Sequence, residues 1–114
     1  MKIKKIDEIN SEKEKDFDNK VCFLWMDDLN VIYVDGKLIY EDDGVDALYL
    51  LKLAEKYNFV YSDLYVEYAY EPEDEEYWIK MNNSFPRNIE DLPMYDRWLK
   101  KTHPDRYEAK KFNL

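Results

Sequence analysis

The residues best suited to chemistry are few in this sequence, and their types restrict what it could catalyse. His103 is the only histidine and Cys22 is the only cysteine. A single histidine excludes multi-histidine metal sites and disfavours Ser-His-Asp and Cys-His catalysis. Cys22 lies in the apolar run 21–25, where a buried, unreactive thiol is expected, and no disulfide can form within the chain. We therefore expect no enzyme built on a protein nucleophile.

Carboxylates are the remaining candidates, but local structure accounts for their spacing. The segment 41–46, Glu-Asp-Asp-Gly-Val-Asp, resembles an ion-binding loop yet lacks the alternating acids and terminal glutamate of an EF-hand. Acids at a helix start explain it through capping. Asp27, Asp35 and Lys37 could form a nuclease-like set, but Asp35 and Lys37 flank a turn. We therefore predict no metal and no cofactor, and a carboxylate-dependent metalloenzyme ranks third among the alternatives.

Acidic residues beside aromatic ones are the more informative pattern. Aromatic side chains surrounded by charged ones are typical of protein-binding patches with a polar rim. Alternate acids on an extended segment lie ~6–7 Å apart, which resembles the spacing of phosphates along a DNA strand and would suit a partial DNA mimic. The alternative is that the acids only keep the protein soluble. The residues predicted to contact a partner are Asp27, Asp28, Asp42, Asp43, Glu71, Glu73, Asp74, Glu75, Glu76, Tyr77 and Trp78.

Length and charge narrow the class of partner. The 114 residues suffice for one domain with one hydrophobic core, which we expect to span 1–114, with a charged segment at 1–20. The 26 acidic and 17 basic residues give a net charge of −9. The electrostatic field of this net negative charge repels nucleic acid and anionic membranes and attracts basic partners. Because neither a secretory signal nor a membrane-spanning apolar run is visible, we expect a cytoplasmic protein of a bacterial or phage-infected cell.

Local patterns predict an antiparallel meander in the first half of the chain. Asp35-Gly36 separates two β-rich runs and suits a two-residue hairpin turn. The apolar run 21–25 supplies a third strand. A helix is predicted over 45–57, with Asp43 as its N-cap, and its apolar residues on most sides predict packing across the sheet.

The second half is predicted to add one hairpin and two short helices. Alternating residues at 64–69 and 77–81 predict two strands joined by an acidic tip at 71–75. Two helices should follow, from Leu92-Pro93 to Lys101 and from Pro104 onward, each with proline in its first turn. At the N-terminus, Ile3, Ile6 and Ile9 could form a thin helical stripe or part of a short strand. The fold class is therefore α+β, with hairpins packed against one central amphipathic helix and two short C-terminal helices.

One tripeptide resembles a known functional motif. His103-Pro104-Asp105 follows the basic stretch 98–102 and is similar to the HPD motif with which J-domain co-chaperones engage a chaperone ATPase. The resemblance covers about a dozen residues, and the preceding chain is predicted as strands instead of the helix that a J-domain places there. Helix capping with proline at the first position explains the tripeptide equally well.

These observations favour a binding protein over an enzyme. The leading hypothesis is a small non-enzymatic acidic inhibitor that occludes the basic surface of a nucleic-acid-handling target such as a nuclease. Phage inhibitors of bacterial defence, including anti-CRISPR proteins, and immunity proteins of toxic nucleases share this profile of size and acidity as classes. The alternative is a viral or cellular accessory or structural subunit whose exposed aromatic residues mediate homo-oligomerisation.

Overall fold

A four-stranded mixed sheet forms the centre of the protein in a computed structural model, which describes residues 16–26, 29–68, 72–81 and 84–112. The strands are β1 (Val21–Met26), β2 (Leu29–Val34), β3 (Lys37–Asp42) and β4 (Leu64–Tyr68), in the spatial order β3-β2-β1-β4. The predicted antiparallel meander β1-β2-β3 is confirmed, and so is the α+β class. The stripe predicted at Ile3, Ile6 and Ile9 lies outside the described residues.

The hairpin between β2 and β3 forms as predicted, because its two turn residues accept left-handed backbone. Asp35 has φ 51° and Gly36 has φ 78°, which is the conformation of a type I′ turn. The carbonyl of Gly36 accepts a 2.9 Å hydrogen bond from the amide of Ile89. A Cβ atom at Gly36 would lie 3.5 Å from the Ile89 side chain. The turn is thus fixed against the segment that leads into the C-terminal helices.

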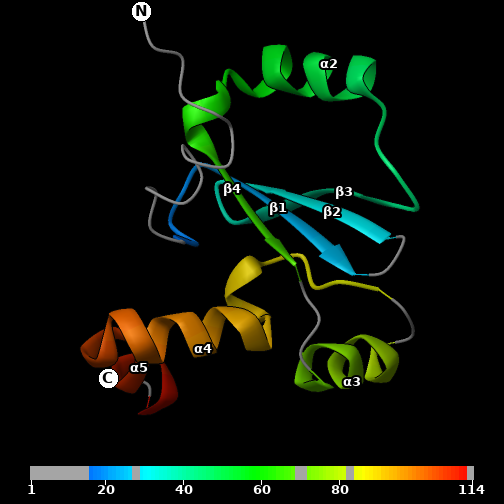
Figure 1. The fold of residues 1–114 in the computed structure, drawn as a ribbon. Helices are drawn as coiled ribbons and strands as arrows, with labels where there is room; N and C mark the ends of the chain where they lie inside the picture. The colour runs from blue at the N-terminus through cyan, green and yellow to red at the C-terminus, as the bar shows by residue number, and fades with distance from the viewer. Residues whose placement is uncertain (1–15, 27–28, 69–71, 82–83, 113–114) are drawn as a thin grey trace, which may run out of the picture.

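Strand alternation divides the core into two layers on opposite faces of the sheet. Cys22 and Leu24 point to one face and pack with the helix α4 (Pro93–Thr102). Val21 and Phe23 point to the other face and pack with Leu53 of the helix α2 (Ala47–Tyr57). Figure 1 shows α2 on one side of the sheet and the helices α3, α4 and α5 on the other. The sheet therefore separates a mostly aliphatic core from an aromatic-rich one.

The helix α2 is shorter and less buried than the sequence suggested. It begins at Ala47 because Asp46, and not the predicted Asp43, caps it by accepting a 2.7 Å hydrogen bond from the amide of Tyr49. The predicted packing across the sheet is confirmed, because Leu53 is buried and Leu50 packs beside it against the sheet, although other apolar residues of the helix stay exposed. The helix ends at Asn58, whose φ of 55° gives a left-handed cap.

The predicted second hairpin does not form. Its first strand exists as β4 but pairs in parallel with β1, and its second strand is instead the helix α3 (Pro72–Lys80). Pro72 stands at the first helical position, where its missing N–H is not needed, and acids follow in the first turn. The acidic tip at 71–75 was therefore the start of a helix misidentified as a turn.

Two helices close the described chain, as predicted. α4 (Pro93–Thr102) begins with proline at its first position, and α5 (Pro104–Phe112) follows after His103. Met94, Tyr95, Trp98 and Leu99 bury the inner face of α4 against the sheet. Short 3₁₀ turns occur at Tyr61–Asp63 and Ile89–Asp91. None of the described helices is long and apolar enough to cross a membrane.

Candidate functional site

The connection between β3 and α2 carries a group of exposed acids. Asp42, Asp43 and Asp46 are all exposed there. Asp42 accepts a 2.7 Å hydrogen bond from the amide of Asp43, and Asp46 accepts one from the start of α2. The neighbouring Glu41 is different, because its carboxylate accepts a 2.9 Å hydrogen bond from the amide of Phe85 and ties β3 to the loop below the sheet. Three carboxylates therefore remain directed to solvent at this end of the sheet.

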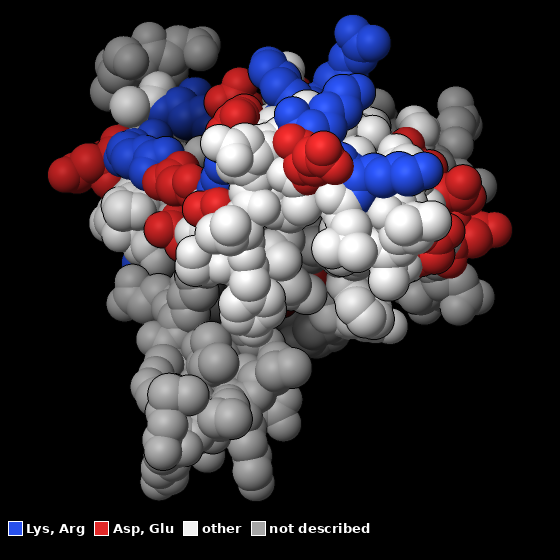
Figure 2. Space-filling view, turned by 90° about the horizontal axis from the view of Figure 1, so that it is seen from above, with Lys and Arg blue, Asp and Glu red and all other residues white. Residues whose placement is uncertain are grey.

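Two acids beside α5, Asp18 and Asp96, are paired with basic side chains. Arg106 of α5 donates hydrogen bonds of 2.8 and 3.3 Å to the Asp18 carboxylate, and Lys110 lies 2.5 Å from the carboxylate of Asp96. Within the described residues, no ion pair involves the acids between β3 and α2. Figure 2 shows acidic side chains gathered at its right-hand margin, the side on which Figure 1 places the connection from β3 to α2. Figure 1 places α3 at the same right-hand side but on the opposite face of the sheet, and we call Asp42, Asp43, Asp46 and the Glu76 described next, taken together, the acidic end.

The acidic stretch of α3 is divided between buried and exposed positions. Asp74 is 5% exposed and accepts a 2.6 Å hydrogen bond from Arg97 of α4. Glu76, two residues later, is exposed and has no ion pair with a described residue. Tyr77 and Trp78 are partly buried and pack against the aromatic core. The predicted residues Asp27, Asp28 and Glu71 lie outside the described residues, and the side chains of Glu73 and Glu75 do as well.

Leucines on α2 form an exposed apolar ridge that the sequence prediction missed. Leu48 is 65% exposed and Leu51 is 67% exposed, although the helix packs across the sheet as predicted. The two are three residues apart, so they lie on one side of the helix. Helix periodicity could have indicated this exposure. At about 100° per residue, Leu48 and Leu51 both lie on the opposite side of the helix from Leu53. We call Leu48 and Leu51 the apolar ridge.

The flank of the sheet beside this ridge is also apolar. Tyr49 contacts Tyr40 of β3 with ring centres 5.0 Å apart, so that side of α2 faces β3. Leu51 lies about 200° further around the helix and therefore faces the other side, toward β1 and β4. Trp25 of β1 and Val66 of β4 are 43% and 51% exposed on the same face of the sheet. Figure 2, which looks down on the α2 side, shows a broad central area without charged side chains.

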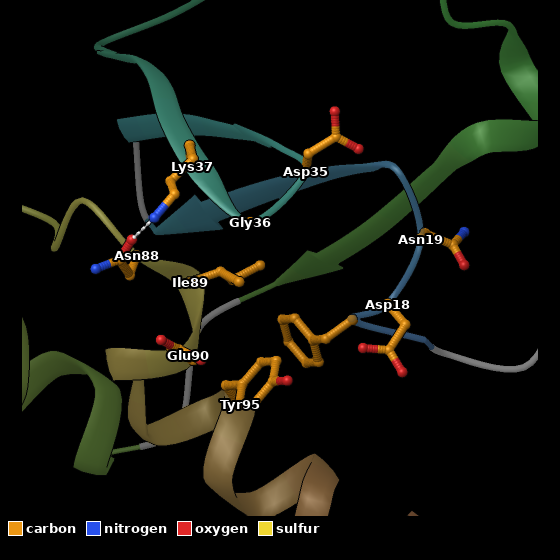
Figure 3. Close-up of a pocket in the computed structure, with 10 residues that line it drawn as sticks. Asp18, Asn19, Asp35, Gly36, Lys37, Asn88, Ile89, Glu90 and Tyr95 are labelled. Atoms are coloured by element: carbon orange, nitrogen blue, oxygen red, sulfur yellow. Dashed lines mark hydrogen bonds between the residues drawn. The ribbon is translucent and has the colours of Figure 1, made fainter.

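A pocket of about 260 Å³, separate from the acidic end and the apolar ridge, lies between the turn of the β2–β3 hairpin, the segment before β1 and the start of α4 (Figure 3). The buried side chains of Phe17, Ile89 and Tyr95 contribute to its wall. Two of its charged groups have partners: Lys37 donates a hydrogen bond to Asn88, and Asp18 is held by an arginine of α5. The pocket therefore combines an apolar wall with polar groups that are partly engaged within the protein.

Groups that could act as nucleophiles are held in their neutral form. Burial, reinforced by Asp16 and Asp18, raises the pKa of the Cys22 thiol to about 12. Burial also raises the pKa of the Tyr33 phenol well above its usual value, and the Tyr33 hydroxyl donates a 2.6 Å hydrogen bond to the carbonyl of Pro86. These buried groups are therefore structural, and Cys22 is the inert thiol that the sequence predicted.

Metal ligands and known relatives are two further features that could define a site. In the part of the chain that the structure describes, no three His, Cys, Asp or Glu side chains come together in a group that could hold a metal ion. His103 caps α4, and its ring lies 5.2 Å from that of Trp98, so the tripeptide 103–105 serves as the junction of two short helices. Comparisons with protein-family models, curated proteins and solved structures find no match for the chain.

Proposed function

We propose that this protein is a small non-enzymatic binding protein that occupies a basic surface on a partner protein. The proposal is carried by one observation: Asp42, Asp43, Asp46 and Glu76 are exposed and lack ion pairs with described residues, whereas Asp18 and Asp96 beside α5 are paired with Arg106 and Lys110. Exposed carboxylates whose charge is not cancelled locally extend an attractive field toward cationic surfaces.

The net charge of −9 determines which partners fit. Two copies of this charge repel each other at long range, and nucleic acid is repelled as well, whereas a basic protein is attracted. Basic surfaces of this kind are common on proteins that bind nucleic acid, because such proteins must neutralise phosphates. A nuclease or another nucleic-acid-handling protein is therefore the proposed target. Occlusion of its basic surface is the proposed mode of inhibition, as for a phage anti-defence protein or a toxin-immunity protein.

The structure changes which residues the proposal relies on. Asp74 is excluded as a contact residue, because it is buried in an ion pair and its replacement by lysine would disrupt the attachment of α3. Asp42, Asp43 and Glu76 are retained from the predicted set, since all three are exposed. Asp46 is added as an exposed acid, although its role as N-cap limits how it can be substituted.

The test is capture of partner proteins from bacterial lysate on the immobilised protein, with two charge-matched variants. Asp42→Lys/Glu76→Lys removes charge from the acidic end. Asp105→Lys/Glu108→Lys makes the same change in net charge at exposed positions of α5. The proposal predicts that basic proteins are retained by the wild type and the α5 variant but not by the first variant. It also predicts that the wild type inhibits nucleic-acid binding or cleavage by the captured protein. Retention of the same proteins by all three would refute it.

A further inference from the structure

The apolar ridge of α2 is not explained by an acidic surface that binds basic partners. Leu48 and Leu51 are each about two-thirds exposed, and charge attraction alone would not require them. Exposed leucines at helical spacing, beside an exposed tryptophan on the adjoining sheet, are typical of surfaces that are covered in a complex. We propose that this ridge forms an interface with a second copy of the chain, in which two α2 helices lie antiparallel about a two-fold axis.

The charges along α2 support a second copy as the occupant. Asp43 and Asp46 precede the helix and are exposed, whereas its second half exposes two lysines, Lys52 and Lys56, and one acid, Glu55. An antiparallel pair places the acidic start of each helix beside the lysines of its partner, so opposite charges meet at both ends of the leucine contact. A parallel pair would place acids against acids. The helix is therefore self-complementary in the one orientation that a two-fold axis produces.

A basic partner fits the ridge less well than it fits the acidic end. The exposed second half of α2 contains Lys52, Glu55 and Lys56 beside the leucines, so its charge is mixed, whereas the acids Asp43 and Asp46 stand at its start. A cationic surface would bring its own charge against these lysines. The two surfaces share Asp43 and Asp46 but differ in their main contacts, which are leucines in the ridge and acids at the acidic end, and self-association does not depend on the proposed function.

The size of the ridge limits the strength of the dimer. Two leucines per copy, with Trp25 and Val66 at their side, form a small contact compared with the interfaces of obligate dimers. We expect a dissociation constant on the order of 100 µM. Added salt screens both the repulsion between two copies of net charge −9 and the attraction between acids and lysines at the ends of the contact, so the dimer, held mainly by leucines, should change little as salt is raised. Binding through the acidic end should weaken under the same change, which separates the two interactions.

Sedimentation analysis over a concentration series to the millimolar range tests the proposal with the protein alone. The wild type should shift from the 14.0 kDa monomer toward twice that mass as concentration rises. Leu48→Gln/Leu51→Gln, which keeps helix-forming residues at exposed positions, should raise the dissociation constant at least tenfold. Phe112→Gln removes an equally exposed apolar side chain from α5 and should leave the dimer unchanged. Circular dichroism establishes that each variant is folded.

A second pair of variants tests the antiparallel arrangement. Lys56→Glu would place an acid beside the partner's Asp46 and should weaken the dimer several-fold. Lys111→Glu makes the same charge change on α5 and should have no such effect. A wild type that remains monomeric at every concentration overturns the proposal and leaves the ridge to a different partner. A dimer that persists unchanged in the leucine variant overturns it too, because the contact must then lie elsewhere.

Discussion

Arg97 donates a 2.6 Å hydrogen bond to the buried carboxylate of Asp74, so an acid from the most acidic stretch of the sequence holds α3 against α4. The Asp74 side chain is 4% exposed and that of Arg97 is 36% exposed, so the arginine retains partial contact with water. This pair separates the acids that maintain the fold from those that are available to a partner. The first prediction follows from that separation.

Replacing Asp74 by asparagine should destabilise the protein, because the hydrogen bond to a charged partner is weakened at a buried position. We expect a loss of about 1–3 kcal/mol in the free energy of unfolding, measured by urea denaturation. Glu76→Gln, which removes an exposed acid from the same helix, should change it by less than about 0.5 kcal/mol. Equal stability of the two variants would show that the ion pair does not fix α3.

The N-cap of α2 gives a second prediction. Asp46 accepts the capping hydrogen bond from the amide of Tyr49, whereas Asp43 lies outside the helix. Asp46→Ala should therefore cost about 1 kcal/mol of unfolding free energy, and Asp43→Ala less than about 0.5 kcal/mol. Thermal denaturation followed by circular dichroism measures both. A larger loss for Asp43→Ala would restore the cap that the sequence suggested.

The reactivity of Cys22 gives a third prediction. Burial raises the pKa of its thiol to about 12, so almost no thiolate is present at neutral or mildly alkaline pH. Alkylation by iodoacetamide should be slow for the folded protein and rapid in denaturant, where burial is lost. Mass spectrometry over time measures the two rates. Comparable rates would mean that the β1 thiol is accessible in the native state.

The buried tyrosines predict a loss of stability at alkaline pH. Burial is the main cause that raises the pKa of both Tyr33 and Tyr65 far above the usual value of 10.0, and a hydrogen bond to Glu67 adds to it for Tyr65. Above that usual value the unfolded chain loses these protons while the folded chain retains them. The resulting stabilisation is therefore complete below pH ~10 and declines as the pH rises further. Phenolate absorbance should show normal titration of exposed tyrosines, with these two ionising only as unfolding begins.

Turns and helix starts could be predicted from the sequence, because they depend on the backbone conformations that neighbouring residues allow. Asp35 and Gly36 adopt the positive φ angles of a hairpin turn, and Pro93 and Pro104 begin helices, so both features were predicted from neighbouring residues. The segment 77–81 was misassigned because its alternation is too short to distinguish a strand from one side of a helix. Pro72, followed by acids, was the helix signal that should have decided between them.

The burial of individual side chains could not be predicted from the sequence, because it depends on contacts between distant parts of the chain. The burial of Asp74 depends on Arg97, which is 23 residues away on another helix, so no local pattern indicates it. The exposure of Leu48 and Leu51 depends on how α2 is oriented over the sheet, with Leu53 inward and Tyr49 against β3. The acids that remain exposed, Asp42 among them, were in the predicted set because turn positions are usually solvent-exposed.

The affinity of the acidic end for a basic partner is the most direct test of the proposed function. Calorimetric titration of the captured basic protein should give a dissociation constant that rises with salt. Asp42→Lys/Glu76→Lys should raise that constant at least tenfold, whereas the charge-matched Asp105→Lys/Glu108→Lys should leave it within about twofold. An equal loss in the two variants would contradict the account, because binding would then depend on net charge alone and not on the acidic end.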